Sequence, residues 1–172
     1  MPNQMGSYFG ETITYVCEHN EDGAMGLMIN RPMELTLREL VAQTGLDGAA
    51  ELTSVAVLEG GPVSHEHGFV LHSDDGDFPA SLSLGNGLKL TTAREVLEAI
   101  CDNRGPYSYL IALGYAGWGP QQLEGELAQN AWLTCPGDRD ILFNTPFEQR
   151  VNKAAAALGI DFRLMSAQAG HA

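Results

Sequence analysis

Alternation of apolar and polar side chains near the start of the chain predicts a β-hairpin. Residues 11–19 (ETITYVCEH) alternate in this way and are rich in β-branched and aromatic side chains, which is typical of a strand. The run NEDG at 20–23 is a strong turn signal, and residues 24–30 (AMGLMIN) then predict the returning strand. We expect this strand to end at Arg31 and Pro32, because proline cannot donate a hydrogen bond to a sheet.

Three threonines stand three residues before a glutamate, which is the spacing of a capping box at a helix start. The pairs are Thr36 with Glu39, Thr92 with Glu95, and Thr145 with Glu148. Because the two side chains of such a pair each satisfy a free backbone N–H, we expect a helix to begin at each pair. These helices should end near Gly45, at about Cys101 and at Leu158, and a fourth helix should run from Pro120 to about Asn130.

Further short apolar runs predict strands between these helices. They are residues 54–60, 68–72, 80–84, 107–114 and 141–144. Strands therefore come in a run first and alternate with helices later, a pattern that favours an α+β fold over a doubly wound parallel one. We expect a mixed sheet with about four helices packed around it, in a single domain over residues 1–172.

The charge of the chain narrows the classes of partner. Its 172 residues include 22 acidic and 9 basic ones, for a formal net charge of −13. Phosphate contacts supply most non-specific affinity for nucleic acids, and an acidic surface also repels anionic membranes, so direct DNA reading and membrane binding are disfavoured. With three scattered cysteines, no apolar run of about 20 residues and no secretory signal at the start, we expect a cytoplasmic protein.

A glycine-rich stretch, LGYAGWGPQQLE at 113–124, joins the strand predicted at 107–114 to the helix predicted from Pro120. Such a turn can present backbone N–H groups to an anion. The lysine of a phosphate-binding loop is missing, however, and the spacing of the three glycines is not that of a dinucleotide fingerprint. We interpret the glycines as allowing a turn over which Tyr115 and Trp118 pack, with an anion or ligand site as the alternative.

A second candidate site lies in the first predicted strand. Cys17 and His19 are two residues apart and would share a face, so an imidazolium could activate the thiol as a nucleophile or redox sensor. The alternative is that Cys17 is buried as a small apolar side chain. Asn20 is expected to serve the turn.

Three histidines in eight residues, His65, His67 and His72, raise the hypothesis of a metal site. The first two follow a Gly-Gly-Pro run in what we interpret as a loop, and no carboxylate–histidine pattern of a catalytic zinc site accompanies them. No nucleophile elbow, metalloprotease helix or calcium loop is present in the sequence either. We therefore expect neither a metal nor a cofactor.

Several of these stretches together resemble the bacterial YqgE/AlgH family. The matching stretches are residues 12–32, 59–63, 68–72, 113–124, 130–133 and the closing GHA. The resemblance implies one compact domain in which helices surround a coiled, bifurcated β-sheet, and a cytosolic bacterial protein. It implies no reaction, because none is assigned to the family; some members are labelled transcriptional regulators.

The polar and reactive side chains within the family stretches define a candidate functional cleft. Its residues are Cys17, His19, Asn20, Arg31, His72, Tyr115, Trp118 and Glu124. Arg31 has two interpretations, because a guanidinium at the end of an apolar strand either pairs with a carboxylate such as Glu18 or binds an anion.

The function expected from these observations is that of a non-enzymatic regulatory protein, which acts by binding a protein partner or a small ligand. The alternative is a thiol-dependent enzyme or redox sensor that uses Cys17 and His19. A regulator that binds DNA directly is the third hypothesis, which the net charge of −13 disfavours.

Overall fold

Eight strands form one sheet in the part of the chain that this computed structural model describes, residues 8–47 and 50–161. The strands are β1 Thr14–Asn20, β2 Gly23–Met28, β3 Pro32–Thr36, β4 Ala56–Glu59, β5 Val63–Ser73, β6 Ser81–Gly85, β7 Leu88–Thr91 and β8 Tyr109–Trp118. The main path of the sheet runs β1-β2-β8-β5-β7-β6, and β3 joins it through β4. The predicted hairpin is confirmed, since β1 and β2 pair antiparallel across the turn at 21–22.

Strand β8 divides the sheet into two branches. Along one edge it pairs antiparallel with β5. Along the other edge its first half pairs parallel with β4, as in Val57 opposite Ile111, whereas its second half pairs antiparallel with β2, as in Ala24 opposite Trp118. One strand thus has two successive neighbours on the same side. The sheet is mixed and bifurcated, and the α+β fold class is confirmed.

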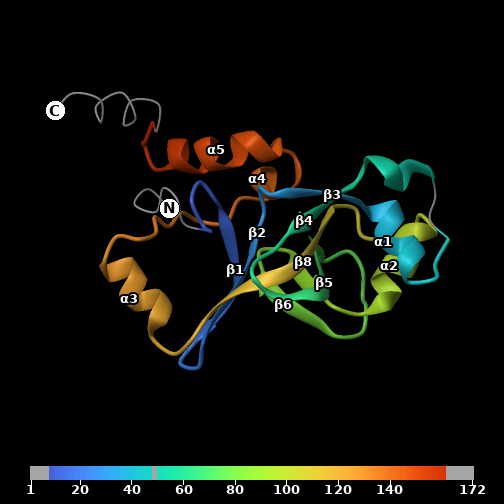
Figure 1. The fold of residues 1–172 in the computed structure, drawn as a ribbon, viewed down its shortest axis with the longest axis horizontal. Coiled ribbons are helices and arrows are strands. Elements are labelled where there is room, and N and C mark those ends of the chain that lie inside the picture. Colours follow the sequence, from blue (N-terminus) through green and yellow to red (C-terminus); the bar gives the residue numbers. More distant parts are fainter. Residues whose placement is uncertain (1–7, 48–49, 162–172) are drawn as a thin grey trace.

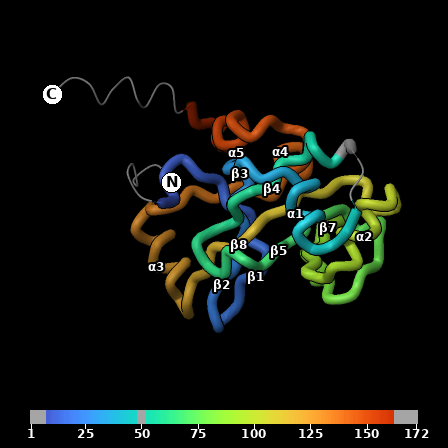
Figure 2. The backbone as a smooth tube through the Cα atoms, turned by 45° about the vertical axis from the view of Figure 1, so that its right-hand side comes forward, coloured from blue at the N-terminus to red at the C-terminus, as the bar shows by residue number. Residues whose placement is uncertain are grey.

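Five α-helices pack around this sheet in the described part of the chain. They are α1 Leu37–Gln43, α2 Arg94–Cys101, α3 Gln122–Ala128, α4 Arg139–Phe143 and α5 Arg150–Ala157. Short 3₁₀ turns at Ala50–Ser54 and Phe147–Gln149 complete the helical elements. Figure 1 shows α1 and α2 at one end of the molecule, α3 at the other and α5 above the β1–β2 hairpin; Figure 2 shows the same arrangement from another side. Among the residues that the structure describes, no helix combines the length and apolar character that a membrane span requires.

The two faces of the central strands belong to different cores, because successive side chains of a strand point to opposite faces. On β8, Ile111 packs in a cluster with α1 and α2, whereas the adjacent Ala112 packs in a cluster with α4 and α5. The neighbouring pair Val57 and Leu58 of β4 divides in the same way. Strands buried on both faces read as continuous apolar runs, which explains the uninterrupted apolar stretch in β8.

Of the three predicted capping boxes, the structure forms one. Thr36 accepts a hydrogen bond from the Glu39 N–H, and the Glu39 carboxylate accepts from the Thr36 N–H, so α1 begins as predicted. The prediction is wrong at α2, where Ala93 is the N-cap and makes no side-chain bond. It is also wrong at Thr145, whose hydroxyl donates to the Asp140 carbonyl instead, so the chain passes through a 3₁₀ turn before α5.

The strand predicted at 141–144 is wrong, because this run forms most of helix α4. Asp138 caps the helix by accepting hydrogen bonds from the N–H groups of Asp140, at 2.8 Å, and Ile141, at 3.4 Å. Three apolar residues in a row cannot distinguish a buried strand from a short buried helix, and here the aspartate three residues upstream of Ile141 decides in favour of the helix.

The turn predicted in the glycine-rich stretch is also wrong in its position, because β8 continues as a strand to Trp118 and does not turn at Gly114. Gly114 has a φ of +72°, a conformation that favours glycine, and it follows the point where β5 and β8 lose regular pairing. Gly61 lies so close that a methyl group there would overlap the Tyr115 backbone. These glycines allow two backbones to approach each other inside the sheet.

Candidate functional site

Cys17 faces the interior and has a partner of its own. It is the extra residue of a bulge in β1, since Val16 pairs with Gly26 and Glu18 with Met25. It packs against the core that α4 and α5 cover, and its thiol donates to the Tyr15 carbonyl at 3.6 Å. Burial raises the pKa of the Cys17 thiol to about 12, which opposes the thiolate that a nucleophile requires.

His19 is brought together with Glu124, another residue of the predicted cleft. The imidazole Nε2 lies 2.7 Å from the Glu124 Oε1, and this contact joins the end of β1 to the first turn of α3. Both side chains are largely exposed. Asn20 serves the hairpin turn as expected, because its Oδ1 accepts from the Asp22 N–H at 2.8 Å. His19 therefore has Glu124, and not the Cys17 thiol, as its hydrogen-bond partner.

Arg31 holds the segment that precedes β1. Its guanidinium lies 3.9 Å from the Glu59 carboxylate, donates to the Gly10 carbonyl at 3.3 Å and stands over the ring of Tyr8, 5.1 Å from the centroid. The Tyr8 hydroxyl donates to the same carboxylate, and burial together with Glu59 raises the pKa of Tyr8 to about 12. The structural interpretation of Arg31 is favoured, but its partner is Glu59 and not Glu18.

His72 is fully buried within β5. Its Nδ1 donates to the Ser73 carbonyl at 2.6 Å, and its Nε2 lies 2.7 Å from the Thr91 hydroxyl, which in turn contacts the hydroxyl of Ser81 at 2.6 Å. Burial lowers the pKa of His72. The residue therefore links β5, β7 and β6 through buried polar contacts.

Three predicted residues do share a hollow. Asn20, Tyr115 and Trp118 line an open groove of about 780 Å³ between the β1–β2 hairpin and strand β6. Tyr115 also packs edge-to-face on Phe69, with ring centroids 5.8 Å apart, so its position is set by the core. The predicted cleft thus divides into a groove, a surface ion pair and three residues with separate structural contacts, namely Cys17, Arg31 and His72.

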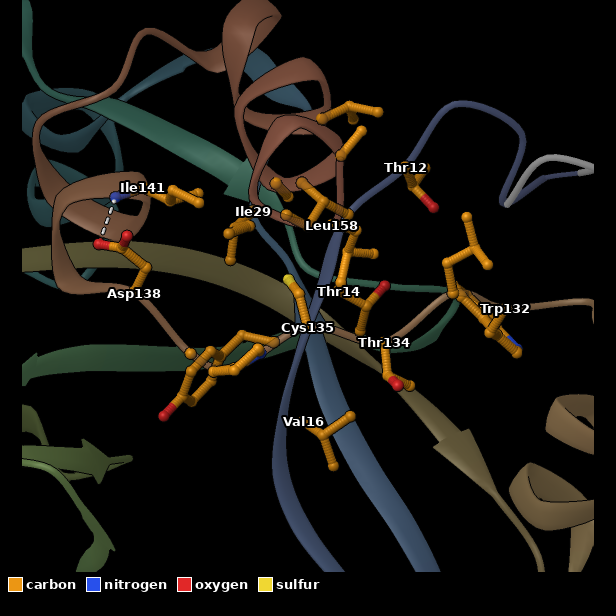
Figure 3. A pocket seen from close by; sticks show the side chains of 18 of the residues that line it. Thr12, Thr14, Val16, Ile29, Trp132, Thr134, Cys135, Asp138, Ile141 and Leu158 are labelled. Atoms are coloured by element: carbon orange, nitrogen blue, oxygen red, sulfur yellow. Dashed lines mark hydrogen bonds between the residues drawn. The ribbon is translucent and has the colours of Figure 1, made fainter. Parts of the chain in front are cut away.

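A smaller apolar pocket, of about 310 Å³, lies between β1, the loop at 132–138 and helix α5 (Figure 3). Its walls combine segments that are far apart in the sequence. They include Thr12, Thr14 and Val16 from β1 and the residues before it, Trp132, Thr134, Cys135 and Asp138 from the loop, Ala154, Ala155 and Leu158 from α5 and its end, and Ile29, Trp118 and Ile141 between them.

One polar atom of a residue that lines this pocket lacks a partner. The Thr14 Oγ1 is buried and makes no hydrogen bond within the described part of the chain. The other polar groups are better satisfied: the Thr12 hydroxyl donates to the Phe9 carbonyl at 2.7 Å, and Asp138 caps α4. Burial raises the pKa of the Cys135 thiol, so this side chain presents a neutral sulfur to the pocket.

Two tryptophans are fixed beside the pocket by a single carboxylate. The Glu126 Oε2 accepts from the indole N–H of Trp118 at 2.9 Å and from that of Trp132 at 2.7 Å, and its Oε1 accepts from Gln122 at 3.0 Å. The two indoles also pack edge-to-face, with centroids 5.7 Å apart. Helix α3 therefore holds both rings against the pocket.

Metal binding finds no support among the described residues, where no group of three or more His, Cys, Asp or Glu side chains could hold an ion. His65 and His67 lie in the irregular part of β5 instead of in a loop, and the His67 side chain contacts only its neighbour Glu66 among the ion pairs of the described chain.

The pocket is the feature that sequence reasoning missed. Trp132 was part of a family stretch, but Thr14, Cys135 and the alanines of α5 were not candidates. A usable signal was present in the run AAAA at 154–157, because small side chains facing a sheet leave space that a leucine would fill.

Comparison with known proteins shows which family the chain belongs to. Residues 1–163 match the AlgH-like family. The chain belongs to this family. A UPF0301 protein of Thioalkalivibrio sulfidiphilus is 48% identical over 172 residues, covering 100% of this chain and 92% of that protein. A UPF0301 protein of Pseudomonas putida W619 is 49% identical over 174 residues, with the same coverage.

Solved structures agree with this assignment. The solution structure of the AlgH protein from Pseudomonas aeruginosa superposes with a TM-score of 0.82 at 48% identity, covering 100% of this chain and 92% of that one. The crystal structure of a Corynebacterium diphtheriae protein, with a TM-score of 0.68 at 16% identity, covers 88% of this chain and 81% of that one and shares the fold alone. The resemblance to the YqgE/AlgH family is confirmed.

Proposed function

We propose that this AlgH-like protein is a non-enzymatic, cytoplasmic regulatory protein that binds a small ligand in the apolar pocket between β1, the 132–138 loop and α5. The observation that carries the proposal is the pocket itself. Its volume of about 310 Å³ lies at the lower end of the roughly 300–1,000 Å³ usual for ligand sites. Its mostly apolar walls and few polar groups are also typical of such sites.

The surroundings of Cys17 and His19, the two residues considered for catalysis, favour a binding protein over an enzyme. Burial suppresses ionisation of Cys17, and His19 is hydrogen-bonded to Glu124 at the surface. The thiol alternative requires the reverse of both, namely an exposed, ionised sulfur beside an imidazolium. Direct DNA binding remains disfavoured by the net charge of −13.

A regulatory role follows from where the ligand would lie. A molecule in the pocket would contact α5, β1 and the loop that carries Trp132. It would therefore connect three segments that line the pocket from different sides. Any ligand that binds the folded state alone stabilises it by mass action. Occupancy would therefore change the stability of this surface, which a partner could sense.

The test is to block the pocket and leave the rest of helix α5 unchanged. Ala155 is buried and lines the pocket, whereas the next residue, Ala156, is exposed. N-phenyl-1-naphthylamine, a neutral fluorescent probe, should bind the wild type at one saturable site. Ala155→Leu should abolish this binding, and Ala156→Leu should preserve it, while thermal melting shows that both variants fold. Equal binding by wild type and Ala155→Leu, or no binding by the wild type, would refute the proposal.

A protein partner is the second candidate, and the groove favours it. The carboxylates of Glu18 and Asp22 line the groove, and the side chains of Val63 and Leu82, 37% and 43% exposed, present apolar surface there. This combination suits an extended partner segment that carries apolar side chains and lysine or arginine. A Leu-Lys peptide should shift groove amides in NMR spectra of the wild type, and Leu82→Glu should remove these shifts. Shifts elsewhere, or none, would exclude the groove.

A further inference from the structure

We infer that the pocket selects neutral, largely apolar molecules and that it excludes anions. The inference rests on the proposed function of the pocket and specifies its class of ligand. Two features support it: the charge of the walls and the state of the nearby helix end.

The charge of the walls opposes an anion. None of the described residues that line the pocket is lysine, arginine or histidine, and the one carboxylate among them belongs to Asp138. A carboxylate or phosphate entering this space would lose water without gaining a cation, which is costly. The net charge of −13 adds a long-range repulsion. Fatty acids and phosphorylated metabolites are therefore unsuited to the pocket.

The helix end beside the pocket offers no anion site either. Free N–H groups at a helix start commonly attract anions, but the start of α4 is already capped. The Asp138 carboxylate accepts from the N–H groups of Asp140 and Ile141, as the dashed line in Figure 3 marks for Ile141. The protein's own carboxylate thus takes the place that a ligand carboxylate would need.

The size of the pocket limits the ligand further. A volume of about 310 Å³ is about twice the roughly 150 Å³ of an apolar cavity that holds benzene. The expected ligand therefore has on the order of 10–20 non-hydrogen atoms.

Three probes with one chain and different head groups test this inference: 1-octanol, octanoate and octylammonium at pH 7.5. The two tryptophans of the chain both line the pocket, so intrinsic fluorescence reports occupancy of the untagged protein directly. We expect 1-octanol to bind at least about tenfold more tightly than either charged probe, as the cost of burying an unpaired charge requires.

The outcomes separate this inference from the proposed function. If octanoate or octylammonium binds as tightly as 1-octanol, the ligand class is wrong while the pocket remains a binding site. If N-phenyl-1-naphthylamine binds and no octyl probe does, the ligand class is again wrong. If none of the four molecules binds, the proposed function itself fails.

Discussion

The indole Nε1 of Trp132 donates a hydrogen bond of 2.7 Å to the Glu126 Oε2, so the loop at 132–138 is tied to helix α3. The same oxygen accepts from Trp118 at the end of β8. One carboxylate thus connects a strand, a helix and the loop that forms a wall of the pocket. Partial burial pushes the pKa of Glu126 upward, but the hydrogen bonds from both indoles and Gln122 outweigh it and leave the pKa lowered.

Glu126→Ala should therefore loosen the loop. We expect the free energy of unfolding to fall by roughly 1–2 kcal/mol, since the carboxylate is only partly buried. A carboxyl with a lowered folded-state pKa stabilises the fold above its unfolded pKa, near 4.5, and loses this effect as the pH falls through the folded value. The difference between variant and wild type should thus be full at pH 7 and shrink below pH 4.5, measured by urea unfolding.

Glu124→Ala is the control for this variant. It removes an exposed carboxylate from the same helix. This carboxylate contacts His19 and neither indole, so the loss of stability should be smaller than in Glu126→Ala. Equal losses in the two variants would show that the Glu126 hydrogen bonds do not hold the loop.

Cys17 should react slowly with alkylating reagents. A pKa of about 12 in place of 9.0 leaves roughly a thousandth of the usual thiolate at pH 7.5, and burial restricts access as well. In a variant with Cys101→Ser and Cys135→Ser, the iodoacetamide rate should be at least about 10³-fold below that of glutathione and should rise to it in denaturant. A rate in the folded protein equal to that of glutathione would instead support the thiol enzyme or redox sensor.

His72 should make the fold sensitive to mild acid. Burial is the largest cause that lowers the His72 pKa, with Lys89 acting in the same direction and the Ser73 carbonyl and Asp75 opposing it. The folded state therefore keeps the ring neutral, while the unfolded chain takes up a proton below about pH 6.5. The stabilising effect of the neutral ring is present above pH 6.5 and is lost as the pH falls.

Melting temperatures at pH 7.5 and 5.5 check this expectation. His72→Asn should have a lower melting temperature than the wild type at pH 7.5, but its melting temperature should fall less between pH 7.5 and pH 5.5. His67→Asn changes an exposed residue of the same strand, and its melting temperature should fall as much as that of the wild type. An unchanged acid response in His72→Asn would contradict the expected linkage.

Two glycines offer a contrast that tests the close approach at the branch point of the sheet. Gly61 has a φ of +155° and no room for a methyl group against the Tyr115 backbone, so Gly61→Ala should destabilise by roughly 2–4 kcal/mol. Gly125 lies inside α3 with nothing within 4 Å, so Gly125→Ala should stabilise by about 0.5–1 kcal/mol. Urea unfolding measures both, and a Gly61→Ala variant as stable as the wild type would show that the two backbones can separate.

Local signals predicted part of this fold. The hairpin and the capping box at Thr36 depend on residues close in sequence, and both are confirmed. The capping box at Thr92 did not form because the helix begins one residue later than the spacing predicts. The strand predicted at 141–144 was wrong because the burial of this run comes from packing against the sheet. Strand β7 escaped notice because Leu88–Thr91 acquires its strand character from pairing on both sides.

The pocket could not be predicted from any single stretch. Thr14, Trp132 and Ala155 meet only after the sheet, the loop and α5 have packed, and none of them carries the chemistry that motif reasoning seeks. The polar residues of the family stretches were more visible, yet several serve turns and ion pairs that hold the fold. Among them, Trp118 is the residue that lines both the groove and the pocket.

The most direct measurement of the central claim is a ¹H–¹⁵N NMR titration of the protein with 1-octanol. The two indole N–H signals, from Trp118 and Trp132, should shift together and saturate with the amides of the 132–138 loop. Signals from the His72 region should stay in place, and Ala155→Leu should remove all the shifts. Absence of saturable shifts, or shifts centred on the groove around Asn20 and Leu82, would contradict the assignment of the ligand site to this pocket.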